Sequence, residues 1–332
     1  MFMPVEQDFL SKIEAHPDKR NLYRAYANWL VANNDPRAEL IFIEEEMRQI
    51  PIYSDRYWEL KPGRNALRDE YEKTWLKQMG YGVDYEPVFY DVPDGWKERW
   101  RLLREFVERW HQIPLGDVGG HAEDIEKTEK SLGMKLPPSV KEWIAFCSEL
   151  IDLSVYGKLI RDCFEVEHLK DLSAISLMLQ GEADFYWAIK EENLGAFDPP
   201  VDGYNLDYDN EKLDHFVHYG LFAPRITSFV FDYLTSYLHG AGGGFSTTIK
   251  TNDELIQSLN NAFPFRSQID NVRVFEKRNI IVLLGSSGYA PDETHLRVEV
   301  WDKASVKDVP AFLWNYTQHG GCFHGKFADE LK

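Results

Sequence analysis

IEKTEKSLGMKLPPSVKEWIAF, residues 125–146, predicts two helices joined by a rigid turn. Gly133 is typical of a helix end, because glycine readily adopts the left-handed conformation that follows the last turn. Pro137 stops the first helix, and Pro138 suits the first turn of the next, where a missing N–H costs nothing. From Val140 onward, apolar residues recur at steps of three and four, which predicts a helix packed against a core. The stretch therefore indicates a fold, and it contains no side chain pattern that points to catalysis.

The flanking sequence predicts helices before this stretch and strands after it. Residues 96–110 predict an amphipathic helix, because large apolar residues recur along one face. Downstream, segments rich in β-branched and aromatic residues predict strands, and a helix at 226–238 follows them. The strands are expected at 164–169, 173–179, 185–190 and 216–219. Helices, then an antiparallel sheet, then a covering helix indicate the α+β fold class.

Residues 241–332 predict a smaller unit in which strands precede a closing helix. Strands are expected at 272–275, 280–284 and 296–301, with a turn at 285–288 and a helix at 309–318. We interpret this unit as a small β-rich extension of the preceding α+β domain.

Residues 5–48 predict three short helices. The segments His16-Pro17-Asp18 and Asn33-Asn34-Asp35-Pro36 separate them. In the third helix Leu40, Ile41 and Ile43 are expected to face inward and Glu44, Glu45 and Glu46 to face solvent. A further amphipathic helix is expected around residues 67–76.

The length of the chain, 332 residues, predicts two or three domains, because a single core rarely grows this large. Residues 81–95 are rich in Gly, Pro and Asp, which favours a linker. We therefore predict a helical module at 1–80, a linker at 81–95, an α+β domain at 96–250 and the extension at 251–332.

The net charge of −18 excludes some partners and favours others. An acidic surface opposes binding to nucleic acid, which is a polyanion, and attracts basic proteins. No apolar run reaches the roughly 20 residues of a membrane span, and no secretion signal is evident. Cys147, Cys163 and Cys322 form no CxxC pair, so we expect reduced thiols, no structural zinc and no cofactor. The sequence thus predicts a cytoplasmic protein, with a monomer favoured.

Two groups of residues offer catalytic or metal chemistry. His215 and His218 lie near several aspartates and could hold a metal or serve a hydrolase, but in a strand this spacing turns the two rings to opposite faces. Cys322 lies between His319 and His324, and a neighbouring imidazole can lower the pKa of a thiol. Structural roles are favoured for both groups, so we expect no enzymatic activity.

The glycine cluster at 240–244 is similar to a phosphate-binding loop only in composition. A Walker loop requires Lys followed by Ser or Thr at the start of a helix, and no Lys stands in that place. A flexible connector is expected instead.

The strongest functional candidate is the acidic segment 182–214, which contains ten acidic residues against two lysines, a balance of −8. Carboxylates steer a basic partner, and the interleaved aromatic residues supply anchors for an interface. A solvated acidic face whose aromatic residues turn inward stays open as the alternative, and the glycine and terminal Glu of a calcium-binding EF-hand loop are absent. The residues expected to contact a partner are Glu182, Asp184, Trp187, Glu191, Glu192, Phe197, Asp198, Asp202, Tyr204, Asp207, Tyr208 and Asp209.

Three stretches resemble known families. The turn at 125–146 and the run FYWAIKEENLGAFDPPV, residues 185–201, resemble the SUKH superfamily of Smi/Knr-type proteins. FLSKIEAHPDKRNLYRAYANWLVANNDPRAELIFIEEE, residues 9–46, resembles the bacterial repeat-companion motif, although Asn28 stands where that motif usually has Asp. The second family has no settled biochemical activity, so it identifies a module and not a role.

The SUKH resemblance implies a binding protein, because many members are bacterial immunity proteins against toxins. We therefore expect a non-catalytic protein whose acidic, aromatic surface neutralises a basic, nuclease-type toxin domain. A regulatory or scaffold protein that docks a non-toxin partner is the alternative, and an unrecognised hydrolase that uses His215 and His218 or Cys322 is a lesser one.

Overall fold

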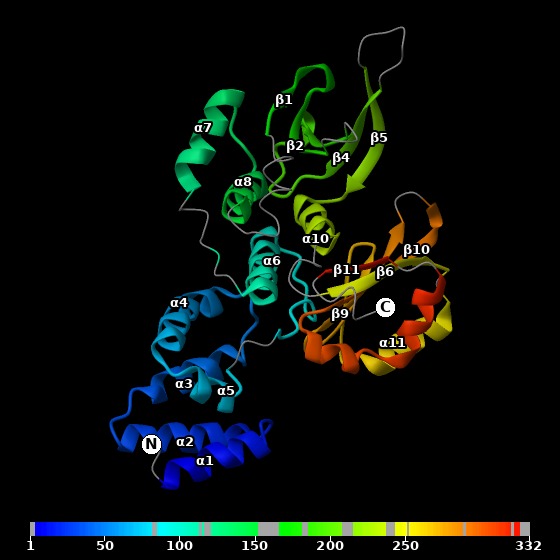
Figure 1. The fold of residues 1–332 in the computed structure, drawn as a ribbon. Coiled ribbons are helices and arrows are strands. Elements are labelled where there is room, and N and C mark those ends of the chain that lie inside the picture. The colour runs from blue at the N-terminus through cyan, green and yellow to red at the C-terminus, as the bar shows by residue number, and fades with distance from the viewer. Residues whose placement is uncertain are drawn as a thin grey trace. The chain divides into compact units, whose positions relative to one another are not determined.

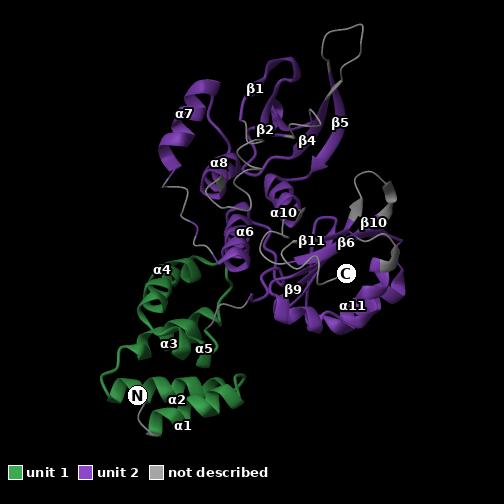
Figure 2. Ribbon diagram, in the orientation of Figure 1, with its two compact units in different colours: residues 1–84 green, residues 85–332 purple. Residues whose placement is uncertain are grey.

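The computed structural model describes residues 4–81, 85–112, 115, 121–151, 166–180, 185–207, 215–236, 243–250, 252–287, 290–319 and 322–325. The chain divides into two compact units, residues 1–84 (unit 1) and residues 85–332 (unit 2), as Figure 2 shows. Within the described residues, unit 1 is helical and unit 2 combines helices with two antiparallel sheets (Figure 1). The predicted α+β fold class is confirmed.

Unit 1 is a helical array, and its first three helices agree with the apolar periodicity of residues 5–48. The helices are α1 (Pro4–Ala15), α2 (Arg20–Ala32), α3 (Arg37–Met47), α4 (Asp55–Glu70) and α5 (Lys73–Gln78). Its core contains a buried chain of hydrogen bonds, in which the Trp75 indole donates to Tyr26 Oη at 3.1 Å and Tyr26 Oη donates to Glu6 at 2.8 Å. Arg37 completes the chain through an ion pair with Glu6 at 2.7 Å. The buried acid is thus partnered, as a buried charge must be.

Helix α3 differs from its predicted orientation. Glu44 and Glu45, expected in solvent, are buried, whereas Ile43 is only half-buried. Glu44 pairs with Arg68 at 2.6 Å, and Glu45 pairs with Arg20. These long-range partners compensate the cost of burying two carboxylates, and neither pairing is visible in the local sequence pattern.

The first part of unit 2 packs helices α6 (Trp96–His111), α7 (Ala122–Leu132), α8 (Pro138–Ile151) and α10 (Ile226–Ser236) with an antiparallel sheet. The sheet has the strand order β1-β2-β3-β4-β5 among the described residues. Its strands are β1 (His168–Leu169), β2 (Ala174–Gln180), β3 (Phe185–Lys190), β4 (Val201–Asp207) and β5 (His215–Ala223). Trp143 on α8 joins the two layers, because its ring lies edge-on to Phe229 and its indole donates to the carbonyl of Leu177 at 3.1 Å.

The turn between α7 and α8 forms as the sequence predicts. Gly133 ends α7 with φ +70°, and α8 begins at Pro138. Ser139 ties the turn to two other segments, since its hydroxyl accepts from the Trp100 indole at 3.1 Å and its N–H donates to the carbonyl of Phe197 at 3.1 Å. The turn therefore positions the loop that follows β3.

The second part of unit 2 is an antiparallel sheet with the order β11-β6-β10-β9-β8-β7 among the described residues. Helix α11 (Asp253–Ala262) packs on its core through Leu255 and Leu259, and the short helix α12 (Ala311–Trp314) packs there through Leu313. The strands are β6 (Gly243–Ile249), β7 (Phe265–Ile269), β8 (Val272–Lys277), β9 (Ile280–Ser287), β10 (Ala290–Val300) and β11 (Cys322–Gly325).

Strand β6 replaces part of the expected glycine connector. A Cβ at Gly244 would lie 2.0 Å from the carbonyl oxygen of Val298 on β10, so the close approach of these strands requires glycine there. The predicted turn at 285–288 also differs, because β9 extends to Ser287. Strands β4, β6, β7 and β11, helix α11 and most of helix α4 were not predicted. The helix expected around 67–76 is divided, since α4 ends at Glu70 and α5 begins at Lys73.

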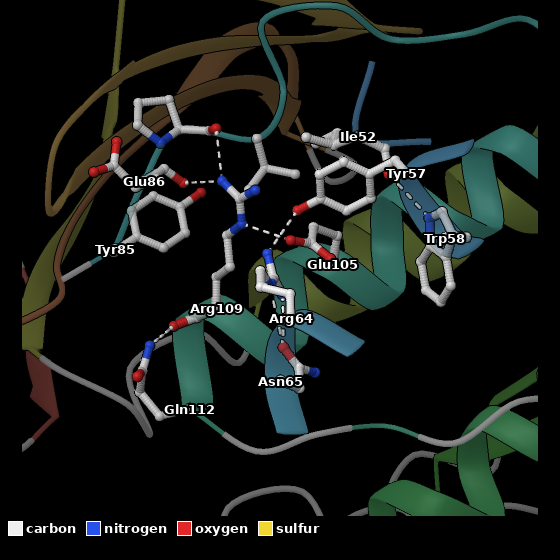
Figure 3. A network of polar contacts seen from close by, with 12 residues as sticks. Ile52, Tyr57, Trp58, Arg64, Asn65, Tyr85, Glu86, Glu105, Arg109 and Gln112 are labelled. Atoms are coloured by element: carbon white, nitrogen blue, oxygen red, sulfur yellow. Dashed lines mark hydrogen bonds and ion pairs between the residues drawn. The ribbon is translucent and has the colours of Figure 1, made fainter. Parts of the chain in front are cut away.

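Residues 85–89, which we call the arm, differ from the predicted linker because all of them except Glu86 are buried in unit 2. The carboxylate of Glu276 on β8 accepts from Tyr85 Oη at 2.5 Å and from the N–H groups of Val88 at 3.1 Å and Phe89 at 2.6 Å. On α6, Arg109 donates to the carbonyls of Glu86 and Pro87, both at 3.4 Å, and pairs with Glu105 at 2.8 Å (Figure 3). The arm thus binds α6 and the second sheet together.

Candidate protein-binding surface

Strand β5 lies at the edge of the first sheet (Figure 1). Within the described residues it pairs only with β4, and the pairing shifts register twice along its length. One shift lies next to Gly220, whose φ of +100° is easily reached only by glycine. An edge strand leaves one row of backbone N–H and C=O groups without a neighbouring strand. No strand among the described residues pairs with this outer edge of β5.

Large apolar side chains extend from this edge into solvent. Tyr219 is 65% exposed and Leu221 is 64% exposed, and Val217 and Phe222 are exposed beside them. We call these four residues the β5 strip. The strip includes both faces of the strand, since Leu221 stands opposite Asp202 in the pairing while Tyr219 contacts Phe185. Several exposed apolar side chains on one edge strand are typical of a contact site.

Aromatic packing supports the β5 strip from within the sheet. The Tyr219 ring lies 5.7 Å from that of Phe185, which in turn lies 5.2 Å from Trp187. Trp187 packs on Phe222 at 5.8 Å, so the predicted contact residue Trp187 lies under the strip. Gly203 on β4 makes room for this row, because a Cβ there would lie 2.6 Å from the tip of the Phe185 ring.

The opposite face of β4 holds two predicted contact residues away from solvent. Asp202 is buried and pairs with His218 at 2.7 Å and Lys190 at 3.3 Å. Tyr204 is buried with its ring 5.0 Å from His218, and burial, with the nearby Asp202 and Glu192 carboxylates, raises its pKa. The side chains of Asp202 and Tyr204 therefore organise the sheet from within and are not offered to a partner.

The loop after β3 holds the other described candidates. Glu191 and Glu192 are exposed, and Glu191 pairs with His168 on β1. Phe197 is 66% exposed and stacks on Trp96 of α6 with a centroid distance of 6.4 Å. Asp198 accepts from Thr227 N at 3.2 Å and Thr227 Oγ1 at 2.7 Å, so it caps the first turn of α10.

Several candidates lie outside the described residues. These are Glu182, Asp184, Tyr208 and Asp209, and of Asp207 only the backbone in β4 is described. In the sequence they flank strands of this same sheet: 182 and 184 precede β3, and 207–209 precede β5.

The residues considered for catalysis are not assembled into a site by the described contacts. His218 pairs with Asp202, and the side chains of His215, His319 and His324 lie outside the described residues. Cys322 is exposed in β11, while burial raises the pKa of the Cys147 thiol well above its ordinary value. Among the described residues, no three His, Cys, Asp or Glu side chains gather as metal ligands, and no helix is long and apolar enough to cross a membrane.

The β5 strip was missed because the run HFVHYGLFA carries apolar residues on both faces, which is typical of a fully buried strand. Its position at the edge is decided by the order of the strands, which is a long-range property. No family model matches the chain, and no curated protein or solved structure matches it either.

Proposed function

We propose that unit 2 is a protein-binding module whose partner lies against β5, and that the protein is an immunity protein of the SUKH kind for a basic, nuclease-type toxin. One observation carries the proposal: β5 is an edge strand with Tyr219 and Leu221 in solvent. Natural proteins usually protect a sheet edge with charged residues, proline or bulges, and β5 has two register shifts, yet its exposed side chains are mainly apolar. Such an edge suits the addition of a strand from another protein, in which backbone hydrogen bonds give affinity and side chains give specificity.

The energetic contribution of the strip follows from its exposure. Complete burial of a large apolar side chain contributes about 1.5–3 kcal/mol, so covering Tyr219 and Leu221, each roughly two-thirds exposed, contributes about 1–2 kcal/mol apiece. Interfaces obtain most of their energy from a few such anchors.

Charge favours a basic partner over an acidic one. The chain carries a net charge of −18, and the segment 182–214, which contains β3 and β4 of the same sheet, contributes −8. Such a field accelerates the encounter with a basic protein and is screened by salt. An immunity protein of this kind would act in the cytoplasm by occluding the active site of the toxin, with its acidic residues in the place of the phosphates of the substrate.

The test is calorimetric titration of the full chain with the catalytic domain of the basic toxin encoded beside it, at about 50 mM and about 150 mM salt. We expect tight binding that weakens with salt. Tyr219→Ala and Leu221→Asp should each weaken it about tenfold or more.

Phe265→Ala is the matched control, because Phe265 is an exposed aromatic residue on β7, the edge strand of the other sheet. Absence of binding at both salt concentrations would refute the immunity role. Binding that is insensitive to Tyr219 and Leu221 would refute the surface. A partner that is not a toxin, yet depends on these residues, would favour the scaffold alternative.

A further inference from the structure

We propose that unit 1 carries a second docking site, a groove that binds a basic amphipathic helix of a partner protein. The groove has a volume of about 540 Å³ and is formed by the end of α2, the following turn, α3 and α4. The groove is shallow and open to solvent, so it suits contact along one face of a ligand and does not enclose it. The inference is independent of the β5 surface, which lies in the other unit.

The groove has an apolar floor that is exposed. Val31 is 54% exposed and Phe42 is 42% exposed, and both line the groove together with Ile43 and Leu60. Exposed apolar residues are common singly, but here they converge in one concave site.

Helix α3 presents this site with a face that the core does not use. Its inner face buries Leu40, Ile41 and Met47. Glu39, Phe42, Ile43 and Glu46 follow the spacing i, i+3, i+4 and i+7, which places them along one side of the helix. All four line the groove, so this side of α3 presents two apolar residues, Phe42 and Ile43, between two acidic ones, Glu39 and Glu46.

The rim of the groove selects positive charge. Three acidic residues line it, Asp35, Glu39 and Glu46, against a single basic residue, Arg56. Asp35 is held by Arg37 at 2.6 Å and Glu46 by Arg56 at 2.6 Å, and the second pair is exposed. Exposed pairs contribute about 0–1 kcal/mol, so a lysine or arginine of a ligand can exchange with Arg56 at little cost. An acidic ligand would meet repulsion instead.

Because helices α3 and α4 form the sides of the groove, we expect a helical ligand and not an extended one. Backbone N–H and C=O groups of α3 and α4 are bonded within each helix, so the groove offers few main-chain partners to an extended peptide. Recognition must therefore come from side chains. An amphipathic helix presents apolar residues at i, i+3, i+4 and i+7 to the floor and can place lysines along the rim.

The test is selection of binders to the full-length protein from a display library of random peptides about 16 residues long, with counter-selection against the Phe42→Asp variant. We expect enriched peptides with an apolar helical stripe and a net positive charge. In fluorescence anisotropy titrations, Phe42→Asp and Val31→Asp should weaken the best peptide at least tenfold. Glu39→Lys should weaken it severalfold and reduce its salt dependence.

Val5→Asp is the control, because Val5 is an equally exposed apolar residue on α1 outside the groove. Circular dichroism checks that each variant keeps its helices. The proposal is overturned if the enriched peptides are neutral or acidic, if a proline placed in mid-peptide leaves binding unchanged, or if Phe42→Asp binds as well as the wild type. Leu221→Asp should not affect this binding, which separates the groove from the β5 surface.

Discussion

Replacement of Glu276 by glutamine should change the stability of unit 2 in a way that depends on pH. Glu276 is fully buried and accepts hydrogen bonds from Tyr85 and from the backbone N–H groups of Val88 and Phe89. Glutamine keeps the shape of the side chain, but it cannot ionise, and its terminal nitrogen donates where a carboxylate oxygen accepts. The substitution therefore separates the cost of a buried charge from the value of the hydrogen bonds.

The magnitude follows from the pKa of Glu276, which burial raises to about 7 from an ordinary value of 4.5, although the hydrogen bonds oppose this rise. The folded state then holds the proton more tightly than the unfolded state. The contribution of Glu276 to the free energy of unfolding is consequently greatest below pH 4.5 and decreases as the pH rises to about 7. A difference of about 2.5 between the two pKa values corresponds to a loss of about 3 kcal/mol.

Glu276→Gln removes this dependence. At a pH of about 5 the wild-type side chain is mostly protonated and, like glutamine, has one oxygen that accepts from the backbone N–H groups and one polar group that can donate to Tyr85 Oη, so the two proteins should differ by about 1 kcal/mol or less. At a pH of about 8 the wild type bears the cost of the charge, and the variant should be the more stable by about 2–3 kcal/mol.

Hydrogen exchange of peptides from β8 and β9 measures the free energy of opening in unit 2 at each pH. Burial also raises the pKa of Glu299, to about 8, but Glu299 is present in both proteins and cancels in their difference. Glu86→Gln is the control, since it alters an exposed carboxylate on the arm itself. A stability difference between wild type and Glu276→Gln that stays constant from pH 5 to 8 would refute the reasoning.

Three further predictions concern packing, capping and thiol accessibility. Gly203→Ala should displace the ring of Phe185 and cost about 1–3 kcal/mol in thermal unfolding, with weaker binding at β5; an unchanged melting temperature would contradict the close contact. Asp198→Ala should cost about 1 kcal/mol in urea unfolding, because the first turn of α10 loses its cap, and Asp198→Asn should recover most of it. Iodoacetamide should label Cys322 in the folded protein and Cys147 only after unfolding, as peptide mass spectrometry would show; rapid labelling of Cys147 would contradict its burial.

Elements with a strong local pattern could be predicted from the sequence. The helix at 96–110 and the turn at Gly133 form within a residue or so of the expected positions, because apolar spacing, glycine and proline act locally. Strand β3 spans the expected residues 185–190.

Elements that depend on distant partners could not be predicted. Val201–Asp207 contains Gly and two Asp, which disfavour strands, yet it forms β4 because Gly203 lies beneath Phe185 and Asp202 pairs with His218. Likewise, the local composition of the segment around the arm, which is rich in Gly and Pro, predicts a loop. Its burial depends on Glu276, about 190 residues further along the chain.

The candidate site also combines features that the local sequence predicts with features that depend on distant partners. The sequence indicates that acidic and aromatic residues gather between 182 and 214, but it does not tell which of them turn inward. Asp202 and Tyr204 share one face of β4 and are buried, because the order of the strands decides which face is covered. Phe197 lies in the loop after β3 and is exposed.

The arm also determines how this chain could be cut or recombined. Truncation of the chain after residue 250 would remove Glu276 and Asn279. Tyr85, Val88 and Phe89 would then lose their hydrogen-bond partners and the surface that covers them. The two sheets of unit 2 are therefore expected to be inherited, expressed and lost as a single piece. A junction before residue 85 leaves that piece intact, so the helical module is the part of this chain that evolution or an engineer could exchange.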